Sequence, residues 1–176
     1  MGTRGLYGFY YKNKFYVVYN HCDSYPEHLG KLIVEEIQKA LDNNQIMDWR
    51  IKMESLKVVN YDIKPTQEEI KKLKPYTDLE VSSESTDEWY YLLKKTQQSL
   101  EKVLDSGFII NDVDDFGRPY YEEYAYILNF DTNQLDYYEE CNLIKSFEIE
   151  GFDGKKVIQE IIKLNETRSF EEDGEL

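Results

Sequence analysis

The first thirty residues constrain the fold more than any other part of the chain. Residues 4–11 and 15–20 are rich in Tyr, Phe and Val, which favour the pleated surface of a β-strand. Between them lies Lys12-Asn13-Lys14, a short polar loop whose asparagine tolerates positive φ. The pattern predicts a β-hairpin that returns the start of the chain to the polar residues 20–25, which we call the elbow.

This hairpin is expected to bring Arg4 close to the elbow. If the loop is centred on its asparagine, Gly5 lies opposite His21 and Arg4 lies opposite Cys22. Opposing residues have Cβ atoms about 5 Å apart, so Arg4 is expected within side-chain reach of His21 and Asp23. A register error of one residue would change which of these side chains share a face.

Two interpretations of the elbow follow from this geometry. In the first, Arg4 pairs with Asp23 as a structural latch that holds the terminus, the commoner role for a charge pair. In the second, the elbow is a small anion-binding pocket in which Arg4 holds the anion, Asp23 orients Arg4 or His21, and His21 titrates. His21, Asp23 and Cys22 are also the candidates for catalysis. The candidate ligand-binding residues are Arg4, Asn20, His21, Asp23, Ser24 and Tyr25.

The composition favours one folded domain. The chain has 176 residues, of which 41% are hydrophobic and 15% aromatic, enough to form a core and too apolar for a disordered chain. We expect a single α+β domain over residues 1–164 and an acidic, flexible tail over residues 165–176. Cys22 and Cys141 are the only cysteines. Because no secretory signal precedes them, we expect free thiols in an intracellular, cytoplasmic protein.

The charge limits the classes of partner. Asp and Glu number 35 against 21 Lys and Arg, which gives a net charge of −14. Direct nucleic-acid binding and adhesion to an anionic membrane are therefore not expected, and no apolar run reaches transmembrane length. The acidity could instead present a surface to a basic protein partner. No cofactor is indicated.

Capping signals predict where the helices begin and end. Ser24 and Glu27 have the spacing of a capping box, but Gly30 weakens that first turn. We therefore expect the regular helix to begin at Lys31 and to run over residues 31–41. A second capping box, at Thr66 with Glu69, predicts a short helix that ends before Pro75. A longer helix is expected over residues 86–105, ended by Gly107, and a last helix over residues 154–164, capped by Asp153.

A second hairpin is predicted in the C-terminal half. Residues 121–130 and 134–140 flank Thr132-Asn133, and the expected pairing places Leu128 opposite Tyr137. A short strand is expected over residues 146–150. The fold class predicted is α+β, with an antiparallel sheet of four to five strands built from the two hairpins and covered by helices. An α/β/β/α sandwich is the alternative architecture.

The segment from Asn111 to Gly117 has some features of a calcium-binding loop. Asp112, Asp114 and Glu123 occupy ligand positions of the EF-hand pattern, but Phe116 stands where another ligand is needed. This departure favours a polar turn, and no metal site is assigned. Asp112, Asp114 and Glu123 remain the alternative if a cation binds.

Two stretches of the sequence resemble a known group of proteins. MGTRGLYGFYY with YVVYNHCDSYPEHLG is similar to the opening of a group of uncharacterised small proteins from phages, large DNA viruses and fungi. YAYILNFDTNQLDYY resembles the second element of that group, with Asn129 in place of its first Asp and Asp131 as its second. The resemblance covers about sixty residues and implies viral origin and kinship more than an activity.

A looser similarity links the predicted topology to N-terminal-nucleophile hydrolases. Those enzymes also begin with two antiparallel strands followed by helices, and their first mature residue is the nucleophile. Removal of Met1 here would expose Gly2 rather than Thr3. Cys22 beside His21 is the second candidate nucleophile. If the protein is an enzyme, a hydrolase is therefore the expected class, although an enzymatic function is not favoured.

Three hypotheses of function remain open. The first is a nucleotide-like or other small anionic ligand at the elbow. The second is an acidic module, such as a counter-defence protein, that binds a basic partner surface. The third is a structural or virion-packaged protein without a ligand.

Overall fold

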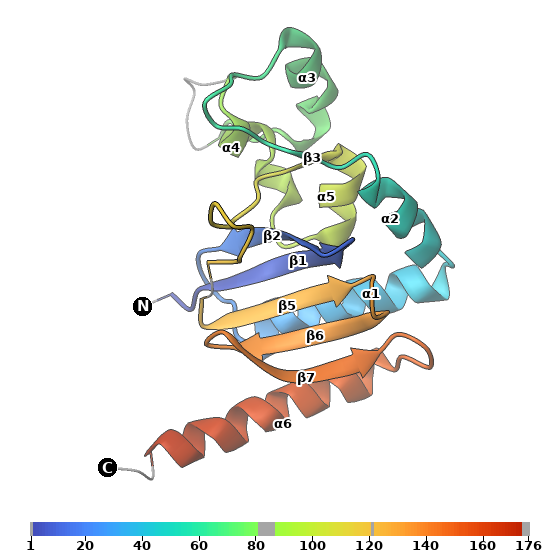
Figure 1. The fold of residues 1–176 in the computed structure, drawn as a ribbon, viewed down its shortest axis with the longest axis vertical. Helices are drawn as coiled ribbons and strands as arrows, with labels where there is room; N and C mark the ends of the chain where they lie inside the picture. The colour runs from blue at the N-terminus through green and yellow to red at the C-terminus, as the bar shows by residue number, and fades with distance from the viewer. Residues whose placement is uncertain (1, 81–86, 121, 174–176) are drawn as a thin grey trace.

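The computed structural model describes residues 2–80, 87–120 and 122–173, with side chains to residue 169 (Figure 1). The fold class is α+β, as predicted. The strands are β1 Gly5–Tyr11, β2 Lys14–Asn20, β3 Lys57–Val58, β4 Phe108–Ile109, β5 Tyr124–Asn129, β6 Gln134–Glu139 and β7 Asn142–Glu148. The α-helices are α1 Lys31–Asp42, α2 Ile46–Met53, α3 Gln67–Lys72, α4 Trp89–Leu92, α5 Leu100–Ser106 and α6 Gly154–Asp173. Short helical turns are η1 Pro26–Gly30, η2 Lys74–Tyr76 and η3 Lys94–Thr96.

The main sheet has five strands in the order β2-β1-β5-β6-β7. Each predicted hairpin is present, and β7 adds an antiparallel edge strand. The two hairpins join through β1 and β5, which run parallel to each other from the pair Gly5–Tyr124 to the pair Tyr10–Asn129. The expected all-antiparallel sheet is therefore wrong at its central join.

The register of the first hairpin differs from the prediction by one residue. Gly5 pairs with Asn20, not with His21, and Tyr11 pairs with Lys14. The loop has two residues, Lys12 and Asn13, and both have positive φ, at 47° and 60°. Such a left-handed two-residue turn matches the twist of the flanking strands better than a three-residue loop does. Because side chains alternate between the two faces of a strand, this one-residue error assigns the side chains of one strand to the wrong face relative to those of its partner.

The second hairpin is displaced by two residues. Leu128 pairs with Leu135 rather than with Tyr137. The turn is longer than expected because the Asn129 side chain accepts hydrogen bonds from the backbone N–H groups of Asp131 and Thr132. A shift of two residues leaves every side chain on its predicted face.

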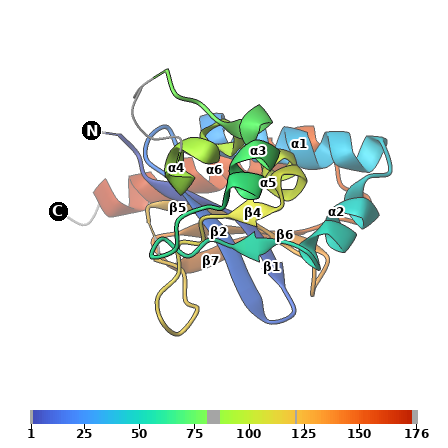
Figure 2. The same cartoon turned by 90° about the horizontal axis from the view of Figure 1, so that it is seen from above.

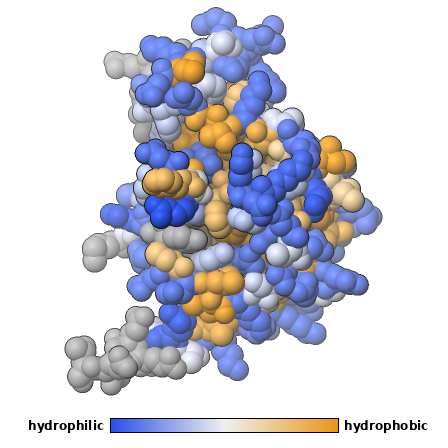
Figure 3. All heavy atoms as spheres, viewed as in Figure 1, coloured by the Kyte–Doolittle hydropathy of each residue, from blue (hydrophilic) through white to orange (hydrophobic). Residues whose placement is uncertain are grey.

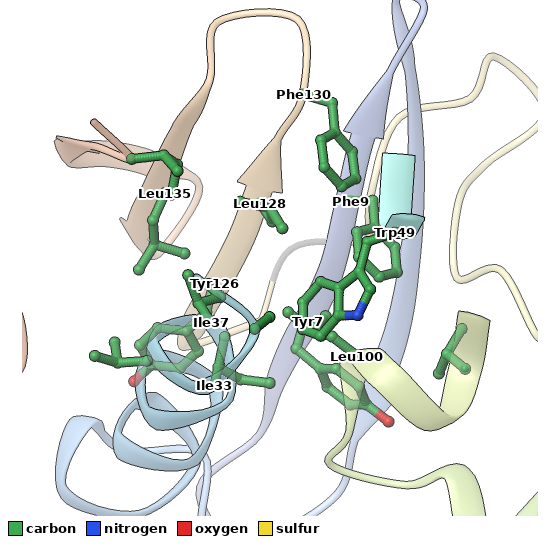
Figure 4. Close-up of a cluster of buried hydrophobic side chains, with 14 of the residues drawn as sticks. Tyr7, Phe9, Ile33, Ile37, Trp49, Leu100, Tyr126, Leu128, Phe130 and Leu135 are labelled. Atoms are coloured by element: carbon green, nitrogen blue, oxygen red, sulfur yellow. The ribbon is translucent and has the colours of Figure 1, made fainter. Parts of the chain in front are cut away.

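One face of the sheet carries the main core. Tyr7, Phe9, Tyr126 and Leu128 project from the central strands toward Ile33, Ile37, Trp49 and Leu100 of the helices (Figure 4). Helices α1 and α6 both lie on this side of the sheet (Figure 2). A helix begins at Lys31, as predicted, because the preceding chain from Pro26 to Gly30 forms a wider π-type turn. The predicted capping box is wrong, since Ser24 is turned inward and Tyr25 precedes the turn without a side-chain cap.

The opposite face of the sheet carries a smaller apolar cluster around Leu6, Val17, Ala125 and Ile127. The chain that leaves β4 runs along β2, with the Asp112 N–H bonded to the Val17 carbonyl at 2.9 Å. The loop that follows lies on the side of the sheet away from α1 and α6 (Figure 2).

A smaller lobe extends beyond the β2 edge of the sheet. It contains α3, α4, β3 and β4, with its own apolar cluster that includes Leu73, Trp89 and Phe108. The capping box of Thr66 and Glu69 is confirmed, and Gly107 ends α5 in the left-handed conformation, also as predicted. The two-stranded β3–β4 sheet belongs to this lobe and contacts the β2 edge through β4. The described residues therefore form no second sheet layer of the kind that the alternative α/β/β/α sandwich requires.

Two predicted helices have different bounds. The single helix expected over 86–105, of which residue 86 lies outside the described residues, is instead α4, a short η3 turn and α5. The first α-helical stretch ends at Leu92, and η3 is separated from α5 by Gln98, whose φ is 60°. Helix α6 is capped by Asp153 as expected but continues to Asp173, through most of the segment predicted as a flexible tail. None of the helices in the described ranges is both long and apolar enough to cross a membrane.

Candidate functional site

The elbow is built around two buried polar side chains, Asn20 and Ser24. The Asn20 amide donates to the Ser24 hydroxyl at 2.8 Å and to the Cys22 carbonyl at 2.6 Å, and its oxygen accepts from the Gln98 amide at 3.2 Å. Ser24 is fully buried. Its backbone carbonyl accepts a hydrogen bond from the Tyr126 hydroxyl at 3.0 Å. Their polar atoms are therefore committed to internal hydrogen bonds, as buried polar groups generally are.

The N-terminal segment is tied to this cluster by its backbone. The Ser24 N–H donates to the Thr3 carbonyl at 3.2 Å, and the Arg4 N–H donates to Glu123 at 3.1 Å. Gly5 lies so close to the elbow that a Cβ there would stand 2.6 Å from the Ser24 Cβ. A glycine at this position is therefore required by the close approach of the two segments.

The charged candidates of the elbow are not joined as predicted. Arg4 and Asp23 are both exposed, and the expected ion pair between them is not among those of the described residues. Asp23 instead has a left-handed backbone, with φ of 57°. Tyr25 is 37% exposed, and Cys22 has an exposed, free thiol. The terminus is thus held by backbone hydrogen bonds and not by a charge pair.

The segment around Asp112 is a polar turn. Asp114 accepts the backbone N–H groups of Phe116 and Arg118, both at 2.9 Å, and forms an ion pair with the Arg118 side chain. Glu123 is bonded to the backbone just before β1. The three candidate calcium ligands, Asp112, Asp114 and Glu123, thus have separate surroundings. The described residues hold no cluster of three or more potential metal ligands.

A recess lies between the β2 edge of the main sheet and the smaller lobe. This cavity, which we call the β2-edge cavity, has a volume of about 260 Å³. Its apolar residues come from both sides and include Val18, Leu93, Val103 and Phe108. Its other linings are Tyr19, Tyr61, Tyr90, Thr96, Gln97, Ile109, Ile110, Asn111 and Asp112. No basic residue is among these described linings.

Asp112 is the acidic side chain of the β2-edge cavity. Its backbone is fixed to β2, whereas its carboxylate has no hydrogen-bond or ion-pair partner within the described part of the chain. Partial burial raises the pKa of Asp112 above its ordinary value, and the nearby Glu122 carboxylate adds to this increase. A half-buried carboxylate without a partner is unfavourable to ionise, so a cation beside it would stabilise the charged form.

Three tyrosines line the cavity together with Asp112. Tyr61 and Tyr90 are at the rim, with 62% and 42% of their surfaces exposed. Burial raises the pKa of the Tyr61 phenol, and the nearby negative charge of Asp112 adds to this increase. Tyr19 contributes the third ring from β2. The cavity therefore combines an apolar interior with an aromatic and acidic opening.

The elbow and the cavity share one connection. The Tyr19 hydroxyl and His21 Nδ1 are hydrogen-bonded at 2.9 Å. His21, predicted as the titrating group of an anion pocket, is thus placed against a wall of the β2-edge cavity. Sequence reasoning identified Asp112 only as a calcium ligand and missed the tyrosines. No spacing pattern unites these residues, because the fold brings them from four separate segments.

Comparison of the chain with protein-family models, with curated proteins and with solved structures finds no match.

Proposed function

We propose that this protein is an acidic binding module for a basic partner protein, and that the β2-edge cavity receives a cationic side chain of that partner. The observation that carries the proposal is the half-buried Asp112 carboxylate, which has no ion-pair partner among the described residues, at a mainly apolar cavity whose described linings include no basic residue. Association with a cation would remove the electrostatic cost of keeping Asp112 ionised there.

The charge of the whole chain also favours a basic partner. A net charge of −14 attracts a basic surface over a distance of about one Debye length and increases its association rate. Hydrophilic side chains cover most of the face shown in Figure 3, with apolar side chains in separate patches. In this proposal the net charge speeds the encounter with the partner, and the β2-edge cavity supplies the selectivity.

The anionic-ligand hypothesis has weaker support from the same geometry. Asn20 and Ser24 were the neutral polar groups expected to contact the anion, but both side chains are buried and bonded within the elbow. Arg4 is exposed, and its backbone N–H donates to the acidic side chain of Glu123. The elbow is better explained as the structural latch of the N-terminal segment.

The proposal is tested with a short lysine-containing, glycine-flanked peptide and the full-length protein, by calorimetry at several salt concentrations. Asp112→Asn is expected to weaken association about tenfold, since it removes a partly desolvated charge partner. Asp115→Asn is the matched control, because it removes the same charge from an exposed position of the same loop. The proposed role of the cavity would be contradicted if both variants weakened association equally, or if neither variant weakened it.

A further inference from the structure

We propose that the β2-edge cavity is an aromatic cage selective for an alkylated ammonium group, the chemistry of an N-methylated lysine side chain or of a free quaternary amine. This inference rests on the proposed function and names the group that the cavity accepts. It joins three features of the lining: several tyrosine rings, one carboxylate, and otherwise mainly apolar side chains.

The aromatic rings supply the first part of the recognition. Tyr19, Tyr61 and Tyr90 all line the cavity, and the face of a tyrosine ring attracts a cation within about 6 Å of its centroid. The molecule already contains one such contact, since the Lys94 ammonium lies 4.5 Å from the centroid of Tyr90. The same ammonium donates to the Tyr90 hydroxyl, so Tyr90 already binds a cation of the protein itself, and Tyr19 and Tyr61 are the rings of the cavity without a lysine contact of this kind among the described residues.

The carboxylate supplies the net charge that rings lack. Asp112 has no ion-pair partner in the described ranges, and it lies close enough to Tyr61 to influence the phenol electrostatically. A cation bound between the rings would therefore be near an opposite charge. Cation attraction by rings and a carboxylate together is stronger in a partly desolvated recess than in open water.

The mainly apolar lining favours a methylated ammonium over a guanidinium group. Of the polar linings, the Asn111 oxygen accepts from the Val17 N–H at 2.8 Å and its amide donates to the Phe15 carbonyl at 3.0 Å. A guanidinium has five N–H donors in a fixed plane, and the apolar walls offer these donors no acceptor. A trimethylammonium has no N–H donors and presents methyl groups to the apolar walls.

The size of the cavity is consistent with this group. Its volume of about 260 Å³ lies below the range of roughly 300–1,000 Å³ that is usual for drug-sized ligands. The end of a single side chain or a small free amine is therefore the appropriate occupant. The surrounding Leu93, Val103 and Phe108 would contact its methyl groups.

The cage is tested by titrating the ¹⁵N-labelled full-length protein with choline, with its neutral isostere 3,3-dimethyl-1-butanol, and with ethanolamine. Choline is expected to bind at least about tenfold more tightly than either of the others, because only it combines charge with methyl groups. Shifts are expected at the amides of residues 108–112. A peptide containing trimethyllysine, compared with choline, distinguishes a protein source of the group from a free amine.

Substitutions at the rim separate the contribution of the ring from that of folding. Tyr61 is largely exposed, so neither Tyr61→Phe nor Tyr61→Leu is expected to unfold the protein. Tyr61→Phe should retain choline binding, whereas Tyr61→Leu should weaken it about fivefold. Asp112→Asn should weaken it further, with Asp115→Asn as the unaffected control.

Each other outcome overturns the cage in a distinct way. Equal binding of choline and its neutral isostere would show that charge is not recognised. Equal binding of ethanolamine and choline, lost in Asp112→Asn, would show recognition of charge without methylation, and the proposed function would stand. If none of the three compounds bound, the cage would be wrong, and the lysine-peptide measurement would decide separately whether the proposed function survives.

Discussion

The Tyr19 hydroxyl lies 2.9 Å from Nδ1 of His21. This contact joins Tyr19, a lining residue of the β2-edge cavity, to the elbow. On the inner side of the same strand end, Asn20 contacts Gln98, which directly follows the cavity residue Gln97. The elbow therefore contacts residues at two sides of the cavity. Of the two interpretations predicted for this polar cluster, a latch and a binding pocket, the internal hydrogen bonds of Asn20 and Ser24 favour the latch.

The elbow should be sensitive to Ser24 and insensitive to Arg4. Ser24→Ala leaves the buried Asn20 amide without one of its acceptors, and we expect it to lower the free energy of unfolding by about 1–3 kcal/mol. Arg4→Ala removes an exposed side chain and should change that free energy by less than about 0.5 kcal/mol. Urea denaturation of both variants measures this. A larger loss for Arg4→Ala than for Ser24→Ala would restore the charge-pair latch.

Choline binding should weaken as the pH falls. The pKa of Asp112 is raised by burial and by Glu122, so its carboxyl takes up a proton at a higher pH than an ordinary aspartate does. The protonated form carries no charge for a cation to pair with. Choline is permanently charged, and the pH dependence therefore reports groups of the protein, with Tyr61, Glu122 and Lys94 as the other titratable neighbours.

The measurement is the dissociation constant of choline between about pH 4 and pH 7. Asp112→Asn should bind weakly at every pH and show a flatter profile. An unchanged pH dependence in that variant would assign the titration to another group.

Glu36 should contribute to stability by capping a neighbouring helix. Its carboxylate accepts the Ser99 hydroxyl and the Glu101 N–H, both at 2.8 Å, at the start of α5. Glu36→Ala should therefore lower the free energy of unfolding by about 1–2 kcal/mol at neutral pH. Glu35→Ala, on the exposed side of α1, is the control and should have little effect.

Glu36 should also make stability depend on pH with a defined sign. Burial raises its pKa in the folded protein, so the folded state keeps this proton to a higher pH than the unfolded chain does. The contribution of Glu36 to stability therefore falls as the pH rises from the unfolded to the folded pKa and is constant above it. The difference in unfolding free energy between wild type and Glu36→Gln, measured across that window, should follow this decrease. A difference that grows with pH would contradict the assignment.

Asp131 should stabilise the tip of the first hairpin. Its two carboxylate oxygens accept the N–H groups of Lys12 and Asn13 at 2.8 and 2.9 Å, and both of those residues have positive φ. Asp131→Ala should cost about 1 kcal/mol and increase hydrogen exchange at these two amides. Thr132→Ala is the neighbouring control. Unchanged exchange in Asp131→Ala would show that the turn holds without the carboxylate.

Local signals predicted local features of the fold well. The start of α1 at Lys31, the capping box at Thr66 and the end of α5 at Gly107 each depend on a few adjacent residues. The register of the first hairpin was missed because Lys12 occupies a left-handed conformation that its residue type does not favour.

Features set by distant contacts were not accessible from the sequence. The helix predicted over 86–105 breaks at Gln98 because the Gln98 N–H donates to the Tyr7 hydroxyl and its side chain donates to Asn20. These tertiary contacts override helix propensity. The β2-edge cavity is of the same kind, since Tyr19, Tyr61 and Asp112 carry no common pattern along the chain.

The parallel pairing of β1 with β5 has a consequence for the order of folding. Gly5 and Tyr124 are neighbours in the sheet, so the centre of the sheet can close only after most of the chain has been synthesised. Until then the N-terminal hairpin exposes an apolar strand with unpaired backbone groups, which is prone to association with other chains. High separation along the sequence also slows closure. We therefore expect folding efficiency in the cell to depend on the time during which β1 is not yet paired with β5.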